Sequence, residues 1–150
     1  MRLVIGIGNT LRGDDGIGVA VAQHIAAQHS TPDLQVVTCQ QLTPELIALI
    51  SQAKQVIFVD ASVTQPSGSV QAQPLDLDGA RLLSVHHTAP SALLMAAKVL
   101  YNAQPPSTLV TIGGQDFGFT EQFSEPVAQA LPRAAQLIMS LLETQSGKAH

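Results

Sequence analysis

The chain has 150 residues, a formal net charge of −4 and a single cysteine, Cys39. This length suits one domain with a continuous core, so we expect a single domain over residues 1–150. The acidic balance gives no support for nucleic acid or an anionic membrane as a partner, and one cysteine allows neither an intrachain disulfide nor a cluster of thiolate metal ligands.

The first predicted element is a short apolar strand, Leu3–Ile5, which follows Arg2 directly. The sequence before it lacks the layout of a signal peptide, and no later run approaches the length of a membrane span. We therefore expect a cytoplasmic protein that does not insert into a membrane.

A glycine turn follows this strand at Gly6 and Gly8, and two adjacent carboxylates, Asp14 and Asp15, follow the turn. The glycine fingerprint of dinucleotide-binding folds, G-x-G-x-x-G, is incomplete, because Leu11 stands at its third glycine position. A pyrophosphate also needs positive potential, whereas this turn presents two negative charges. Carboxylates at the end of a strand favour a cation instead.

The rest of the chain alternates apolar runs with helical patterns. Strands buried on both faces are expected at Leu34–Thr38, Val56–Val59 and Leu109–Ile112, with a weaker edge strand over residues 69–73. Two helices are expected to begin at Ile17 and after an N-cap at Thr43. A third is expected after Thr88, with an apolar stripe of Leu93, Ala97, Leu100 and Tyr101. The last is expected from Val127, with a kink or break at Pro132. Residues 145–150 are expected to form a disordered polar tail. This alternation predicts an α/β fold, a three-layer α/β/α sandwich around a mostly parallel, twisted sheet of about five strands.

Three places in this pattern deliver polar side chains to strand ends. Asp14 and Asp15 follow the first strand, Asp60 follows the third, and His86 and His87 precede a predicted helix. Because the carboxyl ends of parallel strands meet at one edge of a sheet, two carboxylates and one imidazole form a candidate site for a divalent metal. Three protein ligands leave coordination positions open, as a catalytic or recognition site needs.

Each of these residues also has a purely structural interpretation. Asp14 is a preferred N-cap residue for the following helix, and Asp15 is expected in a first helical turn because of the helix dipole. Asp60 could bind backbone amides of its own loop, and His86 and His87 could both be surface imidazoles. Two carboxylates adjacent in sequence usually diverge, which argues against the shared-proton dyad of the aspartic proteases.

The motif Gly6–Gly18, GIGNTLRGDDGIG, resembles the N-terminal signature of the nickel–iron hydrogenase maturation proteases. The resemblance continues through Val59-Asp60-Ala61, His87-Thr88-Ala89-Pro90 and Ile112-Gly113-Gly114-Gln115, so it covers most of the chain in the expected order. The first motif is highly specific, whereas the later matches are persuasive only together.

This resemblance implies an aspartic-type endopeptidase that removes a short C-terminal extension from the hydrogenase large-subunit precursor after nickel insertion. In the family, cleavage lets the C-terminus of the precursor close over the metal centre. By motif position, the metal-contacting and candidate catalytic residues are Asp15, Asp60 and His87, with Asp14 and His86 as lesser candidates. The nickel is expected to be that of the precursor, and another divalent metal could substitute for it.

Two segments depart from the family pattern. The family often carries Asp-Gly-Gly-Thr after the second strand, where this chain has Cys39-Gln40-Gln41-Leu42-Thr43, and it often carries a proline after Gly-x-Gln, where this chain has Asp116. Both differences lie in predicted cleft loops and bear on which large subunit is recognised. Cys39 itself has no histidine fixed near it and is expected to be an inert thiol. The alternative function is a nickel-binding accessory or chaperone protein that uses the same three residues and has no peptidase activity.

Overall fold

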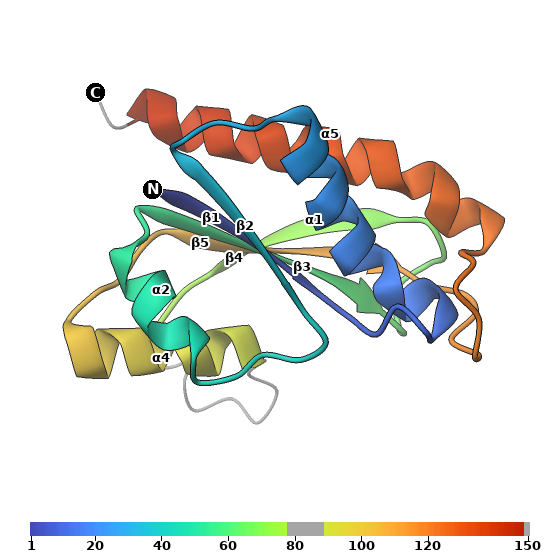
Figure 1. Ribbon diagram of the computed structural model, residues 1–150, viewed down its shortest axis with the longest axis horizontal. Coiled ribbons are helices and arrows are strands. Elements are labelled where there is room, and N and C mark those ends of the chain that lie inside the picture. The colour runs from blue at the N-terminus through green and yellow to red at the C-terminus, as the bar shows by residue number, and fades with distance from the viewer. Residues whose placement is uncertain (78–88, 149–150) are drawn as a thin grey trace.

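A computed structural model describes residues 1–77 and 89–148 and shows one five-stranded sheet (Figure 1). The strands are β1 (Arg2–Ile7), β2 (Leu34–Cys39), β3 (Gln55–Ser62), β4 (Val70–Leu75) and β5 (Ser107–Gly113). Their order is β2-β1-β3-β5-β4, and only β4, at one edge, runs antiparallel to its neighbour. The mostly parallel sheet and its weaker edge strand are therefore confirmed.

Helices cover both faces of this sheet. They are the short 3-10 helix η1 (Gly13–Gly16), α1 (Ile17–Gln28), α2 (Leu46–Gln52), α4 (Ala89–Tyr101) and α5 (Glu125–Lys148). Helices α1 and α5 lie on one face and α2 and α4 on the other, so the three-layer sandwich is confirmed (Figure 1). No helix in the described part of the chain has both the length and the apolar character that crossing a membrane requires.

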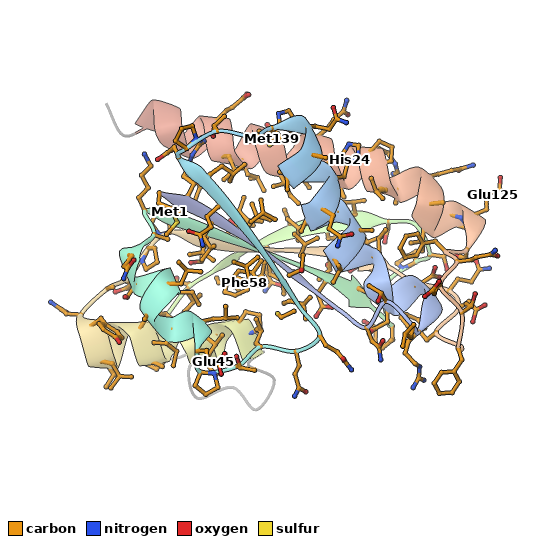
Figure 2. All side chains as sticks on the ribbon, in the orientation of Figure 1. Met1, His24, Glu45, Phe58, Glu125 and Met139 are labelled. Atoms are coloured by element: carbon orange, nitrogen blue, oxygen red, sulfur yellow. The ribbon has the colours of Figure 1, made fainter. Side chains whose placement is uncertain are left out.

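The alternation of side chains along β3 explains why the core has two halves. Val56 and Phe58 are buried against α2 and α4, whereas Ile57 and Val59 are buried against α1 and α5. Phe58 lies near the middle of the molecule (Figure 2). A strand covered on both faces needs such a continuous apolar run. The expectation of burial on both faces is wrong for β2, because it is an edge strand and each of its residues is half-buried or exposed.

The predicted helices differ from the observed ones at their ends. Helix α2 begins at Leu46 without a side-chain cap, so Thr43 contributes only its backbone oxygen, which accepts from the Leu46 N–H at 3.1 Å. The apolar stripe of α4 stops at Ala97, since Leu100 and Tyr101 are 66% and 54% exposed.

Helix α5 is longer than its sequence pattern predicted. It runs through Pro132 without a break, because buried residues on either side of the exposed proline, Ala130 and Ala134 among them, hold the helix against the sheet. It also extends through Lys148, into the segment expected as a tail.

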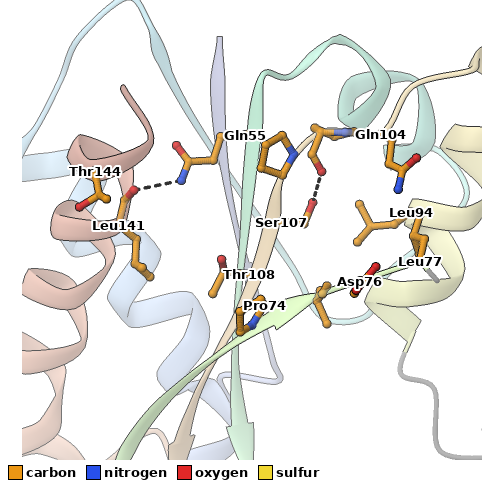
Figure 3. A pocket seen from close by; sticks show the side chains of 13 residues that line it. Gln55, Pro74, Asp76, Leu77, Leu94, Gln104, Ser107, Thr108, Leu141 and Thr144 are labelled. Atoms are coloured by element: carbon orange, nitrogen blue, oxygen red, sulfur yellow. Dashed lines mark hydrogen bonds between the residues drawn. The ribbon is translucent and has the colours of Figure 1, made fainter. Parts of the chain in front are cut away.

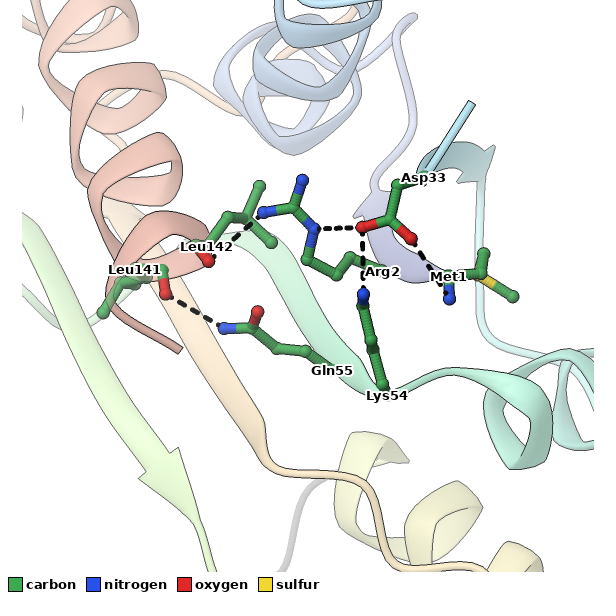
Figure 4. A network of polar contacts seen from close by, with 7 residues as sticks. All are labelled: Met1, Arg2, Asp33, Lys54, Gln55, Leu141 and Leu142. Atoms are coloured by element: carbon green, nitrogen blue, oxygen red, sulfur yellow. Dashed lines mark hydrogen bonds and ion pairs between the residues drawn. The ribbon is translucent and has the colours of Figure 1, made fainter. Parts of the chain in front are cut away.

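A cluster of charges fixes the amino ends of the strands (Figure 4). The Asp33 carboxylate lies 2.9 Å from Arg2 Nε, 3.2 Å from Lys54 Nζ and 3.4 Å from the terminal amine of Met1. Because the cluster is partly exposed, solvent screens these pairs and each contributes little to stability. Its effect is to hold the segment before β2 beside the first residue of β1.

Helix α1 approaches the sheet unusually closely through two glycines. A Cβ built on Gly6 would lie 2.5 Å from the backbone oxygen of Gly18, and a Cβ on Gly18 would lie 2.3 Å from the backbone oxygen of Val59. Real Cβ atoms do not approach backbone at these distances, so only glycine fits at either position. This contact sets the height at which η1, and the carboxylates it carries, sit above the ends of β1 and β3.

Replacing Gly18 by alanine is expected to destabilise the protein. An exposed glycine-to-alanine change within a helix gains stability, but here the new methyl group meets the Val59 backbone, and overpacking costs about 1–3 kcal/mol. Urea denaturation of Gly18→Ala beside Gln23→Ala, an exposed position of the same helix, measures the difference. Equal stability of the two variants would contradict the close approach.

Candidate functional site

A cavity of about 280 Å³ opens where the chain order reverses between β1 and β3. The connection after β1 crosses one face of the sheet through α1, and the connection before β3 crosses the other through α2. Crevices at such switch points are where open α/β sheets bind ligands. The lining residues come from four segments: Ile7, Gly8, Asp15, Gln40, Gln41, Leu42, Asp60 and Pro90.

Asp15 reaches this cavity from η1. Its Oδ2 accepts a hydrogen bond of 2.8 Å from the Asn9 backbone N–H, and its own N–H donates to the Arg12 oxygen at 3.1 Å. Gly8, at φ +151°, allows the turn to pass within contact of the Asp15 backbone. One carboxylate oxygen therefore orients the side chain, while no other described residue hydrogen bonds to Oδ1.

Asp60 reaches the same cavity from the carboxyl end of β3. It continues the alternation of Val56 and Phe58, so its side chain faces the layer of α2 and α4. Its Oδ1 accepts a 2.8 Å hydrogen bond from the Ala61 backbone N–H, and no other described residue binds Oδ2. The structural interpretation of Asp60, as a group that binds loop amides, thus accounts for only one of its two oxygens.

The two carboxylates influence each other electrostatically. Burial, followed by the negative charge of Asp15, raises the pKa of Asp60 to about 6, although the Ala61 N–H opposes this shift. The Cys39 thiol lies on the same face of the sheet, and burial together with the charge of Asp60 raises its pKa. A cation between the carboxylates would relieve their repulsion, so the two side chains fit a divalent ion. Cys39, as expected, stays a thiol.

Asp14 points away from the cavity and is fully buried. Its carboxylate accepts hydrogen bonds from the backbone N–H groups of Gln115, Asp116 and Ser124, each at 2.8 Å, and from Ser124 Oγ at 2.7 Å. Burial alone would raise the pKa of Asp14, but these bonds outweigh it and lower the pKa. Asp14 is therefore not the cap of α1; it fastens the loop between β5 and α5.

Neither candidate histidine belongs to the described part of the chain. His86 and His87 both fall within residues 78–88, which lie outside the described residues. Among the described residues, no group of three His, Cys, Asp or Glu side chains is close enough to hold a metal. Asp15 and Asp60 are thus two of the three predicted ligands brought to one cavity.

Sequence reasoning placed the segment after the second strand in a cleft loop but assigned no role to its amide side chains. Gln40 and Gln41 line the cavity from the end of β2, in the first segment that departs from the family pattern. The position of Gln40 and Gln41 directly after the end of β2 was the available signal that they line the cleft. The second departure, at Asp116, is not in this cavity, because Gln115 and Asp116 are bound to Asp14 instead.

A larger cavity of about 470 Å³ lies at the opposite end of the sheet (Figure 3). It is lined mainly by prolines and leucines and by Gln55, whose buried Oε1 has no hydrogen-bond partner among the described residues. It adjoins the amino ends of β3 and β5 and contains none of the predicted site residues. The smaller acidic cavity is therefore the candidate functional site.

The fold is shared with solved structures of hydrogenase maturation enzymes. The chain is 21% identical to the hydrogenase maturating endopeptidase HybD from E. coli, with a TM-score of 0.82 over 96% of this chain and 93% of that one. It is 27% identical to the NiFe hydrogenase maturation protease HycI from Thermococcus kodakarensis KOD1, with a TM-score of 0.74 over 95% and 92% of the two chains. No family model matches the chain, and no curated protein sequence matches it.

The fold and the cavity define a doubly wound α/β protein with an acidic cleft at its switch point. This fold is similar to that of solved structures named as hydrogenase maturation endopeptidases and proteases, and the motif Gly6–Gly18 agrees with this likeness. The resemblance seen in the sequence is confirmed.

The structure predicts that Asp60 titrates near pH 6. Between about pH 4 and pH 6 the folded protein keeps a proton that the unfolded chain, at its ordinary pKa of 3.8, releases. The free energy of unfolding is therefore expected to fall as pH rises through this window, by at most about 3 kcal/mol. Urea denaturation across this range should show the slope in the wild type and a weaker slope in Asp60→Asn. Carboxyl NMR of Asp15→Asn should show a lowered pKa for Asp60, and titration near pH 4 in the wild type would contradict the prediction.

Asp14→Asn is expected to destabilise the protein by about 3 kcal/mol, because an amide cannot replace a buried carboxylate that accepts four hydrogen bonds. Hydrogen exchange should quicken at the amides of Gln115, Asp116 and Ser124. Asp116→Asn is the matched control, since that side chain is exposed and accepts only from the Gly118 N–H. Unchanged exchange at all three amides would show that Asp14 does not fasten the loop.

Proposed function

We propose that this chain is an endopeptidase that removes a C-terminal extension from the large-subunit precursor of a nickel–iron hydrogenase after nickel insertion. The observation that carries the proposal is the convergence of Asp15 and Asp60 on one cavity, each with an oxygen that no other described residue binds. The likeness to proteins named as hydrogenase maturation endopeptidases supports it.

We assign metal contact in this site to Asp15, Asp60 and His87. The metal is the nickel already held by the precursor, so it belongs to the substrate. Pro90 lines the cavity and follows His87 by three positions in the sequence, a span that extended chain covers in about 10 Å. This supports the assignment of a histidine from residues 86–87 to the same cleft.

Two versions of the chemistry follow from these residues. In the first, contact with the nickel checks that it is present, and the metal polarises the scissile carbonyl or activates water. In the second, the residues only recognise nickel, and a carboxylate removes a proton from water whose oxygen attacks the carbonyl carbon. The C–N bond then breaks and the proton passes to the leaving amine. A pKa of about 6 suits Asp60 to that role.

Neither version uses Asp14, whose carboxylate is occupied by the loop before α5. Localisation in the cytoplasm, and the absence of nucleic acid and membrane partners, stay predictions from the sequence. Nothing in the site favours the alternative of a nickel chaperone, which would bind nickel and release no peptide.

Mass spectrometry of a nickel-loaded large-subunit precursor, incubated with this protein beside a nickel-free control, tests the proposal. We expect loss of one defined C-terminal peptide from the loaded sample alone. Asp15→Asn preserves the shape of the side chain but removes its charge, and it should reduce the rate at least about 100-fold. Glu45→Gln, an exposed carboxylate before α2, is the matched control.

The outcomes separate the alternatives. Full processing by Asp15→Asn would refute both versions of the chemistry. Binding of the loaded precursor without any cleavage would favour the chaperone.

A further inference from the structure

Three exposed side chains lie together on the outer side of the turn that carries Asp15. They are Leu11, Arg12 and Phe119, which we call the rim patch. Leu11 is 56% exposed and Phe119 is 87% exposed. Leu11 and Phe119 therefore leave apolar surface in solvent on two paired segments, and this surface is available for burial against a partner.

The rim patch is held in place from beneath. Thr120 N–H donates to the Leu11 oxygen at 3.1 Å, and Gly13 N–H donates to the Thr120 oxygen at 2.7 Å, so the two loops pair like a short ladder. The buried carboxylate of Asp14 fastens the same loop from inside. A patch fixed in this way loses little conformational entropy when a partner covers it.

Arg12 gives the rim patch its charge. The guanidinium carbon lies 4.7 Å from the centroid of the Phe119 ring, and Nε donates to the Phe117 oxygen at 3.1 Å. None of the ion pairs among the described residues includes Arg12. Its positive charge, stacked on an aromatic ring and exposed, is therefore available to a carboxylate on a partner. Arginine and aromatic residues are also the types enriched among the residues that dominate binding.

The rim patch is continuous with the acidic cleft. The Asp15 N–H donates to the Arg12 oxygen, and Asn9, at the start of the same turn, binds the Asp15 carboxylate. None of the three patch residues lines the cavity, but Leu11 and Arg12 belong to the same turn as Asp15, so a protein that reaches Asp15 is large enough to cover the patch as well. Small molecules would not need this outer surface.

We propose that the rim patch is the docking surface for the precursor, and that it receives an apolar side chain flanked by a carboxylate on the surface of that protein. The apolar group packs on Leu11 and Phe119, and the carboxylate pairs with Arg12. This inference rests on the proposed function for the identity of the partner, and it adds a recognition surface outside the cleft.

The processing kinetics of a nickel-loaded precursor test the proposal. Phe119→Ala is expected to raise KM about tenfold while kcat changes less than about twofold, because the ring acts in binding and not in the chemical step. Arg12→Gln should raise KM and also weaken the dependence of KM on ionic strength, since the charged contact is removed. Leu100→Ala, which removes another exposed apolar side chain near the end of α4, is the control and should leave both constants unchanged.

Thermal denaturation and calorimetric titration of the precursor complete the experiment. The side chains of Phe119 in the patch and Leu100 outside it are both exposed, so the melting temperatures of Phe119→Ala and Leu100→Ala should match that of the wild type. Unchanged KM in Phe119→Ala and Arg12→Gln overturns the docking surface while leaving the peptidase intact. Weakened binding in both variants, with no cleavage by the wild type, keeps the docking surface and refutes the peptidase. A wild-type dimer that Phe119→Ala converts to monomer in sedimentation assigns the patch to self-association and overturns the proposal.

Discussion

One buried negative charge organises the end of the molecule where the candidate functional residues lie. The carboxylate of Asp14 is removed from water, a state that is costly unless hydrogen bonds replace the lost hydration. Four donors from the loop before α5 replace it. The turn after β1, the loop after β5 and the first turn of α5 therefore depend on the same charge.

This interaction also gives the two adjacent carboxylates, Asp14 and Asp15, different roles. Asp14 is surrounded by donors, which lower its pKa, and its charge is fully used within the protein. Asp15 points the other way and accepts one backbone hydrogen bond, so it keeps an oxygen for a ligand. The opposite directions of the side chains agree with the expectation that neighbours in sequence diverge, and they make the shared-proton arrangement of aspartic proteases impossible for this pair.

The parts of the fold that the sequence predicted are those controlled by local pattern. The apolar runs of β1 and β3 are buried on both faces, whereas β5 is fully buried only on the face of Val110 and Ile112. Asp60 follows directly from the end of β3, so its position at the cleft could be expected. The role of Asp14 could not be expected from the sequence, because its hydrogen-bond partners lie 101 to 110 positions away in the chain. A single sequence contains no periodicity that links residues so far apart.

The ends of the helices could be predicted only in part, because they too depend on residues that are distant in the sequence. Thr43 has the right chemistry for a cap, but so do many loop residues, and tertiary contacts start α2 at Leu46 instead. Leu100 and Tyr101 continue the apolar pattern of α4, yet both side chains are exposed to solvent. Periodicity shows which face of a helix is apolar, whereas the neighbouring elements decide how much of that face is covered.

The protonation of the Cys39 thiol bears on which donor atoms a cation would meet in and near the cleft. Sulfur binds soft and borderline metals firmly only as thiolate, and here burial and the charge of Asp60 both keep the proton on the sulfur. Cys39 does not line the cleft, and the described lining offers a cation only the oxygen donors of Asp15, Asp60, Gln40 and Gln41.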